Sequence, residues 1–154
     1  MKYILITLTF LLFMSGCSHQ NAFTKFKMTQ EEEFLAANTQ SSKIESADKI
    51  EGVFTAIYLN NVYKESFIND ENFLIAVYMK NPETLYSFKL NKKSPLKIKK
   101  IEKLQEFGEF TQLMKTKEKW NEYYLVVFST QEKKLNLSIE KESSFSAELL
   151  YLKD

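Results

Sequence analysis

The segment Trp120-Asn121-Glu122-Tyr123-Tyr124-Leu125-Val126-Val127-Phe128-Ser129 carries the strongest strand pattern in the chain. Its two faces are Tyr123, Leu125 and Val127 on one side and Tyr124, Val126 and Phe128 on the other. Because successive side chains of a strand point to opposite faces, both faces are apolar and each has to be covered. The pattern therefore predicts a strand in the middle of a sheet, around which the rest of the domain is organised.

Further alternating runs lie on both sides of this strand. Residues 52–63 and 73–79 are also apolar on both faces, which again favours central strands. Other strands are expected at residues 36–44, 85–90, 96–101, 135–139 and 145–151. Residues 106–114 fit either a helical turn or a bent strand. The aromatic residues expected in the core include Phe54, Phe73, Phe88 and Tyr123.

The run at residues 96–101 differs from the others because it is studded with lysine. Its alternation loses phase at Lys99-Lys100, where one extra residue would restore it, so we expect a β-bulge there. Lysine side chains discourage pairing with other chains, which favours an edge position for this strand.

Seven or eight short strands separated by polar turns, with almost no helix, predict an all-β fold for residues 36–154. We expect an antiparallel β-sandwich with immunoglobulin-like connectivity, and a small closed barrel is the main alternative. The only cysteine is Cys17, so the domain has no disulfide and depends on its core.

Residues 17–35 are expected to form a tether with a possible short helix before the sandwich. Thr29-Gln30-Glu31-Glu32 has the spacing of a capping box, which places a helix at about residues 30–37. A disordered acidic segment is the alternative for so short a helix.

Residues 1–16 have the parts of a secretory signal peptide. Lys2 precedes an apolar run over residues 4–13, and Ser15-Gly16 supply small residues before a cleavage site. The run is too short to span a membrane, which takes about 20 apolar residues, so we expect it to be removed. An ordinary secreted protein with an accidental cysteine is the alternative.

Ser15-Gly16-Cys17 at the end of this run resembles the lipobox of bacterial lipoproteins. The resemblance implies that Cys17 carries a covalent diacylglycerol (and, after cleavage, an N-acyl chain), which together make a stable membrane anchor. Inner-membrane lipoproteins typically have Asp after the cysteine. The presence of Ser18 there favours the outer membrane, and the leaflet stays open.

The composition excludes several classes of function. Removal of residues 1–16 takes away one lysine and leaves 20 Lys against 20 Asp plus Glu, so no net charge attracts nucleic acid. The chain has no arginine, the residue that phosphate and base-edge recognition favours. Its only histidine, His19, lies in the tether, so we expect no histidine-based catalysis and no enzyme. We expect no cofactor beyond the lipid.

Three places are candidates for binding. Asp70 and Glu71 lie in an oxygen-rich loop that could bind calcium, although a solvated loop is favoured. Lys97, Lys99 and Lys100 could bind an anionic surface such as lipid headgroups, although an aggregation-resistant edge is favoured. Trp120 opens its strand and is a possible ligand contact.

Three segments of the predicted core resemble small lipoproteins of Campylobacter and related bacteria, namely residues 56–60, 72–78 and 120–126. Some members of that group are immunoglobulin-like sandwiches, and the resemblance covers about residues 36–152. It implies a surface or periplasmic lipoprotein without catalytic residues, with adhesion as an expected role. We therefore expect a lipid-anchored, non-catalytic module of the cell envelope that binds or adheres to a protein or glycan. A periplasmic accessory or assembly subunit of an envelope complex is the alternative.

Overall fold

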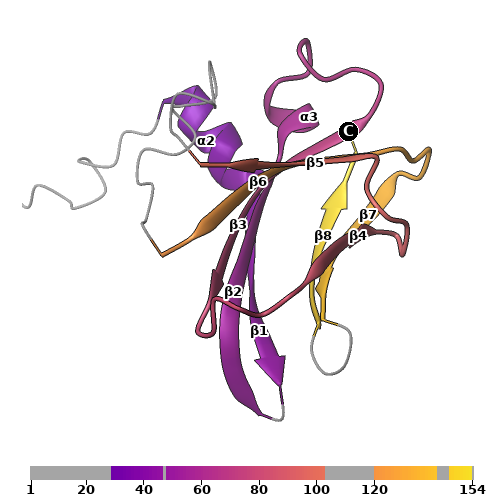
Figure 1. The fold of residues 1–154 in the computed structure, drawn as a ribbon. Coiled ribbons are helices and arrows are strands. Elements are labelled where there is room, and N and C mark those ends of the chain that lie inside the picture. Colours follow the sequence, from indigo (N-terminus) through magenta and orange to yellow (C-terminus); the bar gives the residue numbers. More distant parts are fainter. Residues whose placement is uncertain (1–28, 47, 103–119, 142–145, 154) are drawn as a thin grey trace, which may run out of the picture.

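The protein is an all-β sandwich of two antiparallel sheets, as seen in a computed structural model that describes residues 29–46, 48–102, 120–141 and 146–153 (Figure 1). The larger sheet has the spatial order β1 (Thr39–Ser46), β2 (Lys49–Tyr58), β3 (Glu71–Met79), β6 (Glu122–Phe128), β5 (Lys97–Ile101). The smaller sheet has the order β4 (Ser87–Leu90), β7 (Lys134–Glu140), β8 (Ser146–Leu152). The predicted class and strand number are therefore confirmed, and the two sheets are separate rather than closed into one barrel.

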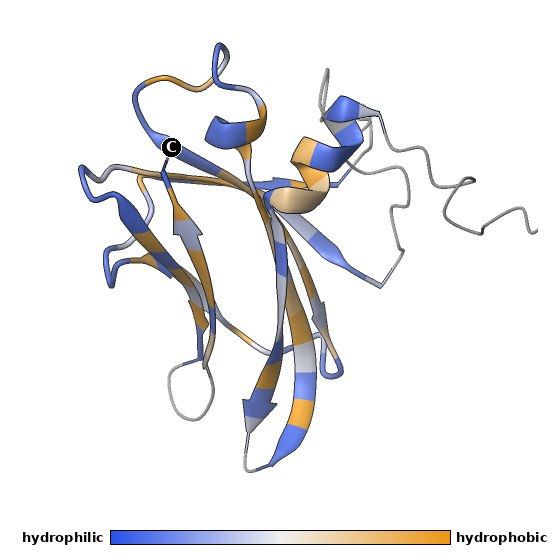
Figure 2. Ribbon diagram, turned by 180° about the vertical axis from the view of Figure 1, so that it is seen from behind, coloured by the Kyte–Doolittle hydropathy of each residue, from blue (hydrophilic) through white to orange (hydrophobic). Residues whose placement is uncertain are grey.

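The strand predicted from residues 120–129 is β6, and its expected position inside a sheet is confirmed. It pairs with β3 on one side and with β5 on the other. Its Val126 and Phe128 are buried between the two sheets, in the core that also holds Phe54, Phe73 and Phe88. Apolar and polar residues alternate along β7, which is covered by the core on one face (Figure 2).

The outer face of the larger sheet carries a second apolar cluster. Ile57, Leu74 and Tyr123 are buried there, and Leu35 and Val62 pack against them from two short helices. The helices are α2 (Gln30–Ala37) and α3 (Leu59–Val62). The two-faced patterns of β2, β3 and β6 therefore have a physical cause, since each strand is packed on both sides.

The expected helix at residues 30–37 is confirmed, together with its cap. Thr29 Oγ1 accepts a hydrogen bond from the Glu32 backbone N–H at 3.2 Å, and the Thr29 N–H donates to Glu32 Oε2 at 2.9 Å. This reciprocal pair satisfies two donors that a helix start otherwise leaves without partners.

The expected strand over residues 52–63 was too long at its C-terminal end. β2 ends at Tyr58, and Leu59–Val62 forms α3 instead. The Tyr63 N–H closes this turn on the Leu59 carbonyl at 2.7 Å. Leu59 stays buried in the outer cluster as a helical residue, so alternation alone did not distinguish the two conformations.

The expected bulge at Lys99-Lys100 was wrong, whereas the expected edge position of this strand is confirmed. β5 is the last strand of its sheet, and its register against β6 runs without interruption from Lys97 to Ile101. No bulge is needed because Ile98 is not a core residue and is 49% exposed. Between β1 and β2 the register does shift, next to Ile44.

The sandwich has two distinct ends. At the α3 end, β2 stops, β3 begins, and α2, α3 and the C-terminal end of β8 lie together (Figure 1). At the opposite end, here called the Trp120 end, β3 stops and β6 begins. None of the helices among the described residues is long and apolar enough to cross a membrane.

Candidate binding site

Trp120 lies at the Trp120 end of the sandwich, directly before β6. It is 65% exposed, so its place at the opening of the predicted strand leaves the indole accessible to solvent. The residue lines a hollow of about 380 Å³ between the last residues of β3 and the start of β6. The other lining residues are Val77, Tyr78, Met79, Lys80, Pro82, Asn121 and Glu122. The volume falls within the range of about 300–1,000 Å³ that is usual for small-molecule sites.

Glu122 connects this hollow to a group of polar side chains behind it. Its Oε2 accepts hydrogen bonds from the Tyr86 hydroxyl at 2.6 Å and the Tyr124 hydroxyl at 2.8 Å. Its Oε1 is ion-paired with the Lys100 ammonium. The two hydroxyls are also 2.9 Å apart. We call Glu122, Lys100, Tyr86 and Tyr124 the Glu122 cluster. These contacts fix the carboxylate in one orientation at the edge of the hollow.

The electrostatics of the Glu122 cluster favour an ionised carboxylate. Burial alone would raise the pKa of Glu122, but the hydrogen bonds from Lys100, Tyr86 and Tyr124 outweigh it and hold the pKa below its usual value. Burial, reinforced by the bond to Glu122, raises the pKa of the Tyr86 hydroxyl far above its usual value. The hydrogen bond to Glu122 raises the pKa of Lys100. At neutral pH the cluster therefore contains one anion, one cation and two neutral phenols.

The three lysines of β5 do not form one patch. Lys97 and Lys99 share the outer face of the sheet with Ile101, whereas Lys100 lies on the other face beside Tyr124. The Lys100 ammonium is 5.9 Å from the centre of the Tyr124 ring and is already paired with Glu122. An anionic surface would therefore meet Lys97 and Lys99 from one side and Lys100 from the other.

Glu71 lies at the α3 end, and it is engaged in contacts within the protein. Its side chain is only 6% exposed, accepts a hydrogen bond from the Tyr58 hydroxyl and is ion-paired with Lys153. The Lys153 ammonium also donates to the Thr130 carbonyl at 3.1 Å. We call Glu71, Tyr58 and Lys153 the Glu71 cluster. A cation at Glu71 would have to displace the Lys153 ammonium.

The neighbouring Asp70 takes part in the loop through its backbone. Its carbonyl accepts from the side-chain amides of Asn60 and Asn72, each at 2.7 Å. Asn60 also accepts from the Asn72 N–H at 2.7 Å. Within the described residues no group of three or more His, Cys, Asp or Glu side chains is placed to hold a metal ion.

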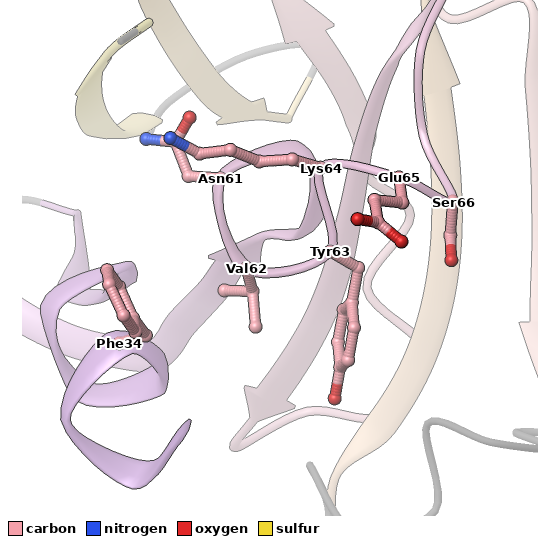
Figure 3. Close-up of a pocket in the computed structure, with 7 residues that line it drawn as sticks. All are labelled: Phe34, Asn61, Val62, Tyr63, Lys64, Glu65 and Ser66. Carbon is pink, nitrogen blue, oxygen red and sulfur yellow. The ribbon is translucent and has the colours of Figure 1, made fainter. Parts of the chain in front are cut away.

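A second hollow, of about 490 Å³, lies between α2 and α3 at the α3 end. Phe34 of α2 and Val62 of α3 face each other across it, and Tyr63 extends beside them (Figure 3). Asn61, Lys64, Glu65 and Ser66 complete its lining. The Trp120 hollow contains the indole of the only tryptophan in the chain beside a carboxylate held by Lys100, Tyr86 and Tyr124, and we therefore take it as the candidate for recognition of a polar ligand.

Sequence reasoning identified Trp120 and Lys100 but missed Glu122, Tyr86 and Tyr124. One signal was available, because Glu122 and Tyr124 are two residues apart in a strand and therefore share a face. Lys100 lies opposite Tyr124 because β5 pairs with β6, and Tyr86 reaches Glu122 from the residue just before β4. Both contacts depend on the packing of segments that are distant in sequence. Cys17 lies outside the described residues.

Comparisons of the chain with protein-family models, with curated proteins and with solved structures find no match.

Proposed function

We propose that the protein is a lipid-anchored lipoprotein of the cell envelope that acts as a non-catalytic binding or adhesion module. The anchor in this proposal is Cys17, with the diacylglycerol and N-acyl chain that its lipobox-like surroundings imply. Ser18 after the cysteine favours the outer membrane. No cofactor other than the lipid is part of the proposal.

The observation that carries the binding role is the Trp120 hollow itself, which lies at the end of the sandwich opposite to the one where the described chain begins. The chain enters the sandwich through α2 and β1 at the α3 end, where Thr39 pairs with Ile57. The hollow lies at the other end of β3. Glu71 and Val77 are six residues apart along this strand, about 20 Å at ~3.4 Å per residue. The hollow and the point at which the described chain enters the sandwich therefore lie at opposite ends of the domain.

Immunoglobulin-like connectivity is also part of the proposal. With β1 set aside, the order is β2-β3-β6-β5 in one sheet and β4-β7-β8 in the other. If these strands are lettered A to G in chain order, the sheets become A-B-E-D and C-F-G, the arrangement of constant-type immunoglobulin domains. An experimental structure in which β5 pairs with β4 instead of β6 would contradict this part of the proposal.

The anchor is tested by fractionating cells that express the native chain or a Cys17→Ala variant. We expect the native protein in the outer-membrane fraction and the variant, which has no thiol to acylate, in the soluble fraction. Protease added to intact cells then distinguishes a surface-exposed domain from a periplasmic one. Equal membrane association of the two forms would contradict the lipid anchor.

A periplasmic accessory subunit of an envelope complex is the second candidate, and β5 favours it. This edge strand has exposed residues from Lys97 to Lys100, and a partner strand could add to such an edge. Affinity purification from solubilised membranes should then recover one stoichiometric partner. Recovery of none, together with surface exposure, would favour adhesion.

A further inference from the structure

We infer that the Trp120 hollow is a saccharide-binding site, in which the indole stacks on a sugar ring and Glu122 accepts hydrogen bonds from its hydroxyls. This inference rests on the proposed binding role and names the class of ligand.

The apolar part of the site is an exposed aromatic face with small apolar neighbours. Trp120 is 65% exposed, and Tyr78, Met79 and Pro82 line the same hollow. The face of an aromatic ring is electron-rich, so it attracts the C–H groups on the apolar face of a pyranose ring. An indole in this position provides more such area than any other side chain.

The polar part of the site contains groups that match sugar hydroxyls. Glu122, Lys80 and Asn121 line the hollow beside Trp120. They offer a carboxylate acceptor, an ammonium donor and a carboxamide whose Nδ2 also donates to the Tyr123 hydroxyl at 3.4 Å. A site of one aromatic face with a few oriented polar groups is suited to a ligand whose two faces differ in the same way.

Glu122 keeps acceptor capacity for a ligand. A carboxylate has about four lone-pair sites, two on each oxygen. Tyr86 and Tyr124 occupy both sites of Oε2, whereas Oε1 accepts from Lys100 and has room for one further donor. Because three donors already hold the carboxylate, a sugar hydroxyl would meet a fixed acceptor and little side-chain entropy would be lost on binding.

The same observations disfavour an added peptide strand or a strongly charged ligand. Glu122 is paired with Val77 across the two strands that border the hollow, so their backbone groups are used within the sheet. The negative charge of Glu122 is balanced by Lys100, so the only net charge among the lining residues is the ammonium of Lys80, which by itself attracts an ion weakly. A neutral saccharide needs neither a strand edge nor a net charge.

The test uses the intrinsic fluorescence of the protein, because Trp120 is its only tryptophan. The full mature chain, solubilised in detergent, is titrated with neutral trisaccharides of glucose, of galactose and of N-acetylglucosamine. We expect at least one to produce a saturable change in emission. Glu122→Gln should then weaken the apparent affinity at least tenfold, and Asn121→Ala should weaken it severalfold. Phe34→Ala, in the other hollow, is the matched control and should leave the affinity unchanged.

Thermal unfolding of each variant establishes that it is folded before its titration is read. The inference is overturned if none of the trisaccharides changes the emission, or if Glu122→Gln binds as tightly as the native chain. It is also overturned if only peptides change the emission, although the binding role would then survive. Failure of the lipid anchor is a separate result, since Cys17→Ala should bind sugar as the native chain does.

Discussion

The Glu71 cluster and the Glu122 cluster use the same side-chain types at opposite ends of the sandwich, with different consequences. Each consists of a carboxylate that accepts from tyrosine and pairs with lysine. The Glu71 side chain is 6% exposed and its lysine 24%, whereas the values at Glu122 and Lys100 are 41% and 50%. The first cluster is sealed between secondary-structure elements, and the second borders a hollow.

The difference in exposure of these side chains suggests which cluster stabilises the fold and which one can contact a ligand. In the Glu71 cluster, the partners are enclosed and breaking one contact leaves the others unsatisfied in a poorly solvated place. In the Glu122 cluster, water can replace a partner that a substitution removes, so the loss in free energy of unfolding is small. The same exposure lets a ligand reach the carboxylate. We therefore propose a stabilising role for the Glu71 cluster and a binding role for the Glu122 cluster.

The largest effect is expected from the same substitution made at both clusters. Glu71→Gln removes the charge that balances Lys153, and we expect it to lower the free energy of unfolding by about 3 kcal/mol. Glu122→Gln should lower the free energy of unfolding by about 1 kcal/mol or less, because solvent screens the more exposed ion pair of Glu122 and Lys100. Urea unfolding of the two variants measures both values. Equal losses would contradict the division of roles.

A substitution at Gly52 tests how tightly the Trp120 end is packed. A Cβ on Gly52 would lie 2.3 Å from the Tyr78 carbonyl oxygen and 2.7 Å from Met79 Sδ, both of which belong to residues that line the hollow. The backbone would have to move, so Gly52→Ala should destabilise the protein by about 2 kcal/mol. It should also weaken ligand binding at Trp120. Calorimetry measures the stability of the variant. If Gly52→Ala is as stable as the native protein, the contact between β2 and β3 is looser than the structure indicates.

The pH dependence of stability should separate the native protein from Glu122→Gln. The pKa of Glu122 is lowered in the folded protein, so its contribution is present above the ordinary value of 4.5 and is lost as pH falls through the folded-state pKa. The contribution of Lys100, whose pKa is raised, is lost as pH rises through its folded-state value. The two proteins should differ in free energy of unfolding by about 1 kcal/mol or less at neutral pH. We expect this difference to become smaller at both acid and alkaline pH. Unfolding curves from acid to alkaline pH check this; a constant difference would rule out the ionic contribution.

The smallest effect on stability is expected on β5, outside both clusters. Lys97→Gln with Lys99→Gln should change the free energy of unfolding by less than about 0.5 kcal/mol, because both side chains are exposed. If these lysines bind an anionic surface, the double variant should bind vesicles of anionic phospholipid less well than the native domain. Lys100→Gln is the comparison, since it acts on the Glu122 cluster instead. Unchanged vesicle binding would leave β5 with the role of a protected edge.

The sequence predicted those features that depend on local pattern. Alternation identified most of the strands and the interior position of β6, and the Thr29–Glu32 spacing identified α2. It did not predict α3, because the apolar Leu59 is buried whether the segment is helical or extended. The expected bulge in β5 was wrong because Ile98 and Ile101 lie on opposite faces of a regular strand, with Ile101 in the outer cluster and Ile98 half exposed.

The candidate site was only half predictable, for a related reason. Trp120 could be singled out because it is the only tryptophan in the chain and precedes the strongest strand pattern. The Glu122 cluster gathers side chains from β5, β6 and the loop before β4, and which of these segments lie side by side is not encoded in any local spacing. The same holds for the Glu71 cluster, whose Tyr58 and Lys153 are far apart in the chain.

The most direct test of the account asks which end of the sandwich binds. The single indole N–H of Trp120 gives one resolved signal in a ¹H–¹⁵N correlation spectrum of the labelled protein. On titration with an oligosaccharide that changes the fluorescence, we predict shifts of this signal and of the backbone amides of Lys80, Asn121 and Glu122. The amides around Tyr58 and Glu71 should stay in place. Shifts confined to the α3 end, with the indole signal unmoved, would contradict the assignment of binding to the Glu122 cluster.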